Sequence, residues 1–196
     1  MISQSPPTLT FPENVSEFVK KTYDDCETIL EFGSGGSTIL AGRKERRKIF
    51  SVESSKDWAD YMENQIAQMN LPGEIKIHYV DIGRTKEWGF PARRKNISQW
   101  PNYSLSVWNR SDFIDPDVIL IDGRFRKGCF LTSLSKIHKE TTILWDDYTD
   151  RPQYHFIEEI IQPIRAVGRM AVFECAPGLI SEKHKDFIND ALYDPA

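Results

Sequence analysis

A glycine-rich turn beside an acidic residue is the first sign of chemistry in this sequence. The turn follows an apolar run and has the sequence Glu31-Phe32-Gly33-Ser34-Gly35-Gly36-Ser37-Thr38. Glycines at the end of a strand let a ligand approach the backbone, and a following helix offers unpaired N–H groups. A dinucleotide fingerprint would place a glycine where Thr38 stands, and Glu31 would repel a pyrophosphate but attract an ammonium group. The turn favours a cationic cofactor; the alternative is a tight strand-to-helix turn with a capping serine.

A second acid, Glu53, ends the next apolar run, 22 residues after Glu31. An acid about 20 residues beyond a glycine-rich turn can accept hydrogen bonds from ribose hydroxyls. A solvated carboxylate at a strand end is the alternative, but the pairing with the glycine-rich turn favours a role in binding a cofactor.

Three aspartates follow two later apolar runs, Asp122 after the first and Asp146-Asp147 after the second. If both runs are parallel strands, all three side chains lie at one edge of the sheet, where open α/β sheets bind ligands. Three converging carboxylates need a cation or a proton. Oxygen ligands suit Mg²⁺, Mn²⁺ or Ca²⁺; in the alternative interpretation Arg124 and Arg126 pair with Asp122 and Asp146.

Residues 83–115 show no regular period and carry three of the five tryptophans, Trp88, Trp100 and Trp108. The segment holds six basic residues against three acidic ones, and such long insertions are often lids or binding loops. Aromatic and basic side chains together can bind a nucleobase, an aromatic acid or a phosphate. The alternative is a small satellite core.

His155, after the Asp146-Asp147 pair, is a candidate general base because its ordinary pKa is near neutral.

The elements that position these residues alternate between short apolar runs and amphipathic runs. Strands are predicted at 28–32, 48–53, 74–80, 118–121 and 141–145, with two short strands around a turn in 164–175. Helices are predicted from Pro12 onward, at about 37–43, from a Ser54/Asp57 capping box to residue 69, and around 130–137, 156–161 and 181–193. We therefore expect one α/β domain over 1–196, a Rossmann-like, doubly wound, mostly parallel sheet with the lid at 83–115 between strands three and four.

Composition limits the function further. The chain has 196 residues, a formal charge of −4, and 40% hydrophobic residues, as expected for a globular domain and not for a general nucleic-acid binder. Its longest aliphatic run, Val118–Ile121, is far too short for a membrane span. The three cysteines form no disulfide or metal motif, and the start has no signal-peptide pattern, so we expect a cytoplasmic protein.

The successive motifs resemble those of class I S-adenosylmethionine-dependent methyltransferases. The resemblance rests on Ile29–Gly35, Phe50–Glu53, Val80–Ile82 and Asp117–Gly123, in that order, and covers about residues 12–175. It implies that S-adenosylmethionine is the cofactor, with Glu31 near its amino-acid end, Glu53 at the ribose, and Asp81 and Ile82 at the adenine. The family often has a glycine where this chain has Ser37; here the glycine is displaced to Gly36. The predicted cofactor-binding set is Glu31, Gly33, Ser34, Gly35, Ser37, Thr38, Glu53, Ser54, Asp81, Ile82, Asp122 and Gly123.

The stretches Ile121–Gly123 and Trp145–Tyr148 are similar to those of metal-dependent O-methyltransferases of the catechol and macrocin types. That resemblance implies an Mg²⁺ ion on Asp122, Asp146 and Asp147 that binds the hydroxyl of the acceptor. Arg124 and Arg126 depart from the sugar-modifying branch, which tends to carry an acid there.

The leading hypothesis is therefore a methyltransferase acting on a small, anionic or aromatic acceptor, with O-methylation favoured. Its predicted catalytic residues are Asp122, Asp146 and His155, and its predicted substrate residues are Arg124, Arg126, Trp88, Trp100 and Trp108. A non-catalytic module that binds the same cofactor is the alternative, and an NAD-dependent oxidoreductase is disfavoured by Thr38 and Glu31. The sequence predicts no membrane or nucleic-acid partner and leaves a homo-oligomer open.

Overall fold

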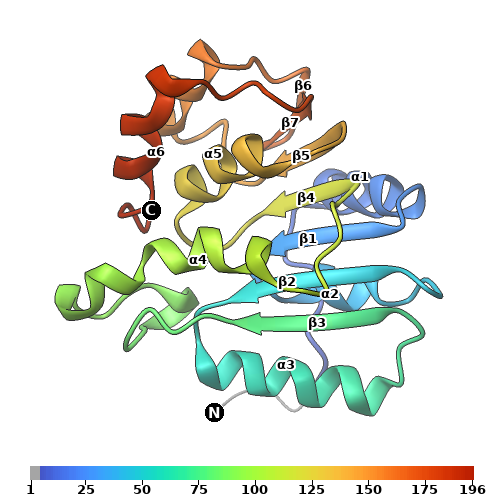
Figure 1. Ribbon diagram of the computed structural model, residues 1–196. Helices are drawn as coiled ribbons and strands as arrows, with labels where there is room; N and C mark the ends of the chain where they lie inside the picture. Colours follow the sequence, from blue (N-terminus) through green and yellow to red (C-terminus); the bar gives the residue numbers. More distant parts are fainter. Residues whose placement is uncertain (1–4) are drawn as a thin grey trace.

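The computed structural model of the chain describes residues 5–196. A seven-stranded sheet with the order β3-β2-β1-β4-β5-β7-β6 forms its centre (Figure 1). The strands are β1 (Thr28–Phe32), β2 (Lys48–Glu53), β3 (Glu74–Tyr79), β4 (Val118–Ile121), β5 (Thr141–Trp145), β6 (Arg165–Val167) and β7 (Met170–Cys175). The first five strands pair in parallel, while β7 pairs antiparallel with β5 and with β6. The predicted Rossmann-like, mostly parallel sheet is confirmed.

The central strands lie where the apolar runs predict them, because each run is bounded by residues that favour turns. In β1 and β4 every residue is buried, as expected for strands covered by helices on both faces. Register pairs Phe32 with Val52 on one side and with Ile121 on the other, so three strands end at the same level. The residues that follow these ends therefore share one edge of the sheet.

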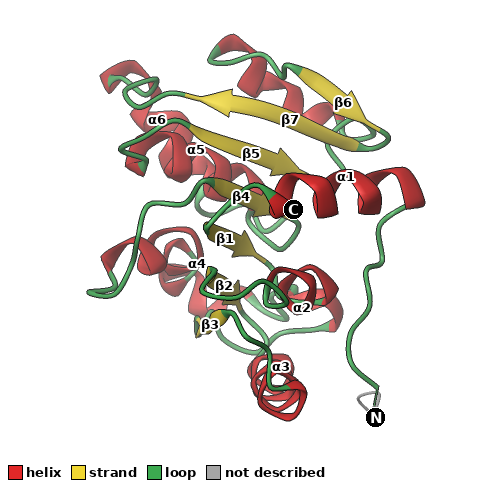
Figure 2. Ribbon diagram, turned by 90° about the vertical axis from the view of Figure 1, so that its right-hand side faces the viewer, coloured by secondary structure: helices red, strands yellow, loops and turns green. Residues whose placement is uncertain are grey.

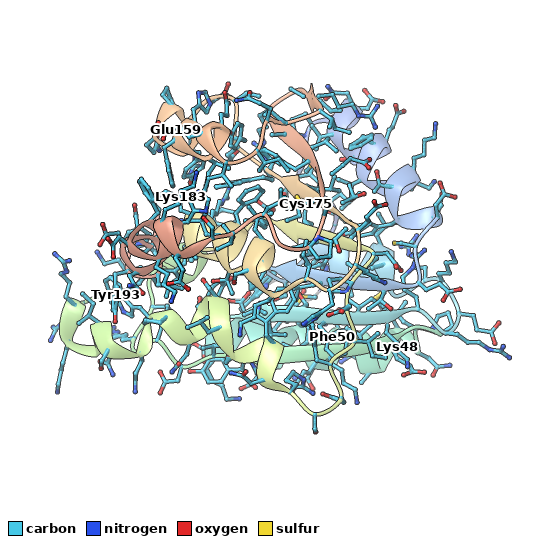
Figure 3. The ribbon with its side chains drawn as sticks, turned by 45° about the horizontal axis from the view of Figure 1, so that its top comes forward. Lys48, Phe50, Glu159, Cys175, Lys183 and Tyr193 are labelled. Atoms are coloured by element: carbon cyan, nitrogen blue, oxygen red, sulfur yellow. The ribbon has the colours of Figure 1, made fainter. Side chains whose placement is uncertain are left out.

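Helices cover both faces of the sheet (Figure 2). One face carries α1 (Glu13–Asp24) and α2 (Gly36–Ala41), and the other carries α4 (Pro101–Leu105), α5 (Arg126–Lys136) and α6 (Lys185–Ala191), while α3 (Lys56–Met69) lies beside β3. Each face has its own core: Val15, Val19 and Tyr23 of α1 pack on one, and Phe130 and Leu134 of α5 on the other. Cys175 of β7, labelled in Figure 3, is buried in the α5 core, without a disulfide.

Three predicted elements differ from those observed. The N-cap of α3 is Ser55, whose side chain accepts the Trp58 N–H, because the hydroxyl of Ser54 is bound elsewhere, to the carbonyl of Gly89. Residues 83–115 contain short helical turns, namely η1 (Glu87–Gly89), η2 (Arg94–Gln99), α4 and η3 (Ser106–Asn109). The 152–159 segment is a 3₁₀ helix, η4 (Pro152–Glu159). In residues 5–196 no helix has the length and apolar character needed to span a bilayer.

Asp117 joins three strands at the opposite, amino edge of the sheet. Its Oδ2 accepts the backbone N–H groups of Glu27 at 2.9 Å and Thr28 at 2.8 Å, and its Oδ1 accepts Lys139 Nζ at 2.5 Å. Burial alone would raise the pKa of Asp117, but Lys139 and the two N–H groups lower it below its ordinary value. The carboxylate therefore stabilises the folded state in its charged form.

We expect Asp117→Ala to lower the free energy of unfolding by about 1–3 kcal/mol, the usual contribution of hydrogen bonds to a charged group. Because the folded pKa is lowered, this contribution is present above the unfolded pKa and is lost as the pH falls through the folded pKa. Urea unfolding should show the gap between wild type and variant shrinking from about pH 6 to about pH 3. Glu17→Ala, on the exposed face of α1, is the control; a gap independent of pH would contradict the role of the charge.

Candidate functional site

A cavity of about 880 Å³ opens at the carboxyl edge of the sheet. Residues that directly follow β1, β2 and β4 line it, as the topology of open α/β sheets requires. Its size is in the range of small-molecule binding sites. The lining consists of residues 5–11, 33–37, 53–55, 86–89 and 122–124, together with Trp58, Tyr61 and Tyr103.

The glycine-rich turn forms one wall, and two of its glycines are required by close contacts. Gly33 has φ +106°, and a Cβ there would lie 2.8 Å from the backbone nitrogen of Gly123. A Cβ on Gly36 would lie 2.2 Å from the carbonyl carbon of Thr8. The glycine displaced from position 37 to position 36 is thereby explained: the N-terminal segment passes directly over Gly36.

Glu31 does not line the cavity; it lies beneath the turn, fully buried. Tyr23 Oη donates to its Oε1 at 2.9 Å, and Thr38 Oγ1 donates to its Oε2 at 2.5 Å. Thr38 Oγ1 in turn accepts the N–H of Gly35 at 3.0 Å. Burial raises the pKa of Glu31. The expected contact of Glu31 and Thr38 with a ligand is therefore replaced by an internal chain of hydrogen bonds that positions the turn.

Glu53 lines the cavity at the end of β2 and is tied to the neighbouring backbone. Its Oε1 accepts the N–H groups of Ser54 at 2.7 Å and Ser55 at 2.8 Å, and its Oε2 accepts the hydroxyl of Ser34 at 2.9 Å. Burial raises its pKa, while these hydrogen bonds act in the opposite direction. Oε2 also accepts the backbone N–H of Ser34 in a long bond of 3.5 Å. This weak bond is the one that a ligand donor in the cavity can replace.

Several cavity residues escaped the sequence analysis. The N-terminal segment 5–11 crosses the site, and Tyr61 Oη donates to the carbonyl of Ser5 at 2.5 Å. Trp58, in the first turn of α3, donates its indole N–H to the carbonyl of Ser34 at 2.9 Å. The hydroxyl of Tyr103 lies against Gly123, where a Cβ would approach it to 2.3 Å. Trp58 could have been predicted from the sequence, because it follows the strand that ends at Glu53 by only a few residues. The contacts of Tyr61 and Tyr103 join residues far apart in the sequence and could not.

The three aspartates do meet, as the parallel strands predict. One oxygen of each of Asp122, Asp146 and Asp147 lies within 4.8 Å of the others. Asp122 lines the cavity and Asp146 is fully buried. Burial raises the pKa of Asp122 to about 7; Asp146 and Asp147 add to the shift, and Arg126 opposes it. The cluster is therefore a site where negative charge needs compensation.

Arginines supply that compensation. Arg126, itself 3% exposed, donates its Nη2 to Asp122 Oδ1 at 3.2 Å and its Nη1 to Asp147 Oδ2 at 3.0 Å. Arg169 donates two hydrogen bonds to Asp146, from Nε to Oδ1 at 3.0 Å and from Nη2 to Oδ2 at 2.7 Å. Arg151 Nη2 donates to Asp147 Oδ2 at 2.8 Å. The predicted pairing of arginine with Asp122 is confirmed for Arg126, whereas Asp146 pairs with Arg169 and Arg124 stays apart.

Arg126 also bonds to the backbone at the ends of two strands. Its guanidinium donates to the carbonyl oxygens of Asp122 at 3.0 Å, Gly123 at 3.0 Å and Asp146 at 2.6 Å. With the two carboxylates, these acceptors use all five N–H groups of a guanidinium. One side chain thus joins the carboxyl ends of β4 and β5.

This arrangement does not fit the expected Mg²⁺ site. The carboxylate oxygens are of the type that Mg²⁺ prefers, but three guanidiniums already balance the three carboxylates. A divalent ion would have to displace Arg126 from Asp122 and Asp147, and Arg169 from the fully buried Asp146. The buried guanidinium of Arg126 would then lack its anionic partners, at high cost. The cation at this edge is arginine.

The remaining predicted residues divide into two groups. Arg124 and Trp88 line the cavity with Ser34, Gly35, Ser37 and Ser54. The others do not line it. Asp81 accepts the N–H of Gly83 on the surface, and Ile82 is in the core. Trp100 packs on Phe125 and Trp108 on Phe113, while His155 contacts the ring and the carbonyl of Tyr148. Trp100 is only 3% exposed, so we assign it to the core instead of to a substrate.

Comparison with solved structures places this architecture in a family. A methyltransferase-like protein from Silicibacter pomeroyi is 37% identical; the match covers 97% of this chain and 99% of that one, with a TM-score of 0.92. The O-methyltransferase TomG of tomaymycin synthesis from Streptomyces achromogenes, solved with S-adenosylmethionine, is 14% identical over 87% of this chain and 82% of that one (TM-score 0.56). An S-adenosylmethionine-dependent O-methyltransferase from Thermotoga maritima is 14% identical over 89% and 69% of the two chains (TM-score 0.57).

The sequence itself matches no protein-family model and no curated protein. The two more distant likenesses show the fold, while the similarity to the Silicibacter protein extends over nearly the whole of both chains. The chain belongs to the class I methyltransferase family, as the motifs predict.

The contact between Gly36 and Thr8 gives a direct test of the N-terminal wall. Alanine has a higher helix propensity than glycine. We nevertheless expect Gly36→Ala to destabilise the ligand-free protein by about 1–3 kcal/mol, because the added methyl group overpacks the contact with Thr8. Gly35→Ala is the matched control, because a Cβ there meets nothing within 4 Å and φ is extended at 174°. Differential scanning fluorimetry compares the two; a higher melting temperature for Gly36→Ala would show that the segment does not lie over α2.

Proposed function

We propose that the chain transfers a methyl group from S-adenosylmethionine to an oxygen of a small acceptor bound in the cavity. The observation that carries this proposal is the cavity itself: eight of the twelve predicted cofactor residues line it, at the ends of β1, β2 and β4. These eight are Gly33, Ser34, Gly35, Ser37, Glu53, Ser54, Asp122 and Gly123. S-adenosylmethionine supplies an activated methyl group on a positively charged sulfur.

The residues present fit such a cofactor. Glu53 offers an acidic oxygen at the strand end where ribose hydroxyls are expected. Asp122, also in the lining, offers a second carboxyl group, whose charged form suits the positive charge of the cofactor. The backbone of the turn at 33–37 can approach the ligand because Gly35 has open space where a side chain would be. Residues 5–11 and Trp58 also line the site.

Methyl transfer depends on holding the acceptor oxygen, the methyl group and the sulfur in line. The hydrogen bonds from Arg126 to the carbonyl oxygens of Asp122 and Gly123 fix the backbone of these residues, so this wall of the cavity is held in place. Asp122 is the carboxyl group of this wall, and burial brings its pKa to about 7, so it is the candidate for receiving the proton of the acceptor hydroxyl. Asp146 and His155, the other predicted catalytic residues, do not face the cavity.

Cofactor binding is tested by isothermal titration calorimetry with S-adenosylmethionine. We expect Glu53→Gln to weaken binding by about tenfold or more, as loss of a charge-assisted hydrogen bond predicts. Glu63→Gln, on the surface of α3, is the matched control and should bind as the wild type does. Melting temperatures of the ligand-free variants separate binding from folding; absence of binding in the wild type would contradict the proposal.

Metal independence follows from the arginine cluster. We expect chelation by EDTA to change methyl transfer by less than about twofold. In Arg126→Gln, loss of the buried guanidinium should destabilise the fold by about 3–5 kcal/mol, and Mg²⁺ should then raise the melting temperature of the variant but not of the wild type. Arg169→Gln, which removes a more exposed partner, is the second variant if Arg126→Gln does not fold. Wild-type turnover that stops on chelation would contradict this assignment.

A further inference from the structure

Arg124 is a cation without an anion. It directly follows Gly123 in the cavity wall, and its side chain is about half-buried. Within residues 5–196 its Nε is buried with no hydrogen-bond partner, and no ion pair reaches its guanidinium. Its three neighbours in the cluster, Arg126, Arg151 and Arg169, are all paired with aspartates. Burial and the nearby charge of Arg126 lower the pKa of Arg124.

An unpaired, partly buried guanidinium gains strongly from an anion placed beside it, because charge-assisted hydrogen bonds are strong and bidentate on carboxylates and phosphates. Asp122 does not supply this anion, because its bonded partner is Arg126. The missing partner therefore has to come from a molecule in the cavity.

A hairpin at residues 84–92 lies beside Arg124 in the cavity lining. Its two ends are joined by the bonds from Lys86 N–H to the carbonyl of Phe90 and from Ala92 N–H to the carbonyl of Arg84, both 2.7 Å. The hydroxyl of Ser54 donates to the carbonyl of Gly89 at 3.1 Å, which fixes the hairpin to the end of β2. A Cβ on Gly89 would lie 3.9 Å from Arg124 Cγ, so the hairpin tip and Arg124 are neighbours.

The tip of the hairpin presents to the cavity one aromatic ring, one further cation and one exposed acid, Glu87. Trp88 lines the cavity, yet it is 83% exposed. Its φ of +59° is in the left-handed region, which is strained for a tryptophan and points to a functional constraint. An exposed indole offers a flat face on which a planar ring can stack. Lys86, also in the lining and exposed, adds a second positive charge.

We propose that Arg124, Lys86 and Trp88 form the acceptor subsite, and that the acceptor is a planar aromatic ring that carries a carboxylate or a phosphate. Arg124 and Lys86 bind the anionic group and Trp88 stacks on the ring. This inference rests on the proposed methyl transfer, because it assigns part of the cavity lining to the acceptor of that reaction. All three side chains act by binding the acceptor.

The test uses the 196-residue chain saturated with S-adenosylhomocysteine, so that no turnover occurs. Four probes are titrated by calorimetry: benzoate, phenyl phosphate, the neutral benzamide, and the non-aromatic cyclohexanecarboxylate. We expect benzoate or phenyl phosphate to bind about tenfold more tightly than benzamide or cyclohexanecarboxylate. The tighter of the two anions identifies whether the natural group is a carboxylate or a phosphate.

Variants assign the two contributions separately. Arg124→Gln, which leaves Lys86 in place, should reduce the preference for benzoate over benzamide, and Trp88→Ala should remove the preference for benzoate over cyclohexanecarboxylate. Both should keep the affinity for S-adenosylmethionine within about threefold of the wild type. Arg46→Gln, on the surface with its side chain 90% exposed, is the matched control and should change neither preference.

The outcomes separate this inference from the proposed function. Wild-type protein that binds the cofactor but shows no preference among the four probes would overturn the acceptor subsite alone. Arg124→Gln that loses the cofactor and keeps the benzoate preference would reassign Arg124 to the cofactor and would equally overturn it. Failure of the wild type to bind S-adenosylmethionine would contradict the proposed function itself, and calorimetry with the cofactor alone detects that result first.

Discussion

The bonds of one buried guanidinium hold the carboxyl edge of this sheet together. Two parallel strands, β4 and β5, end in acidic residues only one strand spacing apart, and carboxylates so close repel one another. Arg126 relieves that repulsion and uses its remaining N–H groups on the carbonyls of the strand ends. Because the backbone of Asp122 and Gly123 forms a wall of the cavity, the shape of the site depends on this residue.

The two glutamates of the site differ in whether their carboxyl groups bind only the protein or also face the cavity. Glu31 is used entirely within the fold, where it holds Thr38 and through it the turn at Gly35. Glu53 accepts hydrogen bonds from three neighbouring residues and also lines the cavity. A carboxylate beside a ligand must be held in one orientation. The carboxylate oxygens of Glu53 accept hydrogen bonds from the neighbouring loops and also carry the negative charge at the cavity.

The sequence predicted the central strands well, because a continuous apolar run bounded by turn residues has few other interpretations. It also placed Asp122, Asp146 and Asp147 at one edge, since parallel strands leave no other place for them. It could not show what neutralises them: Arg169 lies in the turn before β7, and only the antiparallel pairing of Trp145 with Ala171 brings it there. In residues 83–115, 3₁₀ turns and a five-residue helix are too short to produce a detectable period. The contact of Thr8 with Gly36 is equally long-range.

The antiparallel return of β7 has a consequence for the order in which the chain can fold during synthesis. The strands that bear the three aspartates, β4 and β5, are complete once residue 147 has been made, but Arg151 and Arg169 are not. Until the β6–β7 hairpin has left the ribosome, Asp146 has no guanidinium partner and its burial is opposed by its own charge. The neutralisation of Asp146 at the carboxyl edge is thereby deferred to the last sixth of the chain.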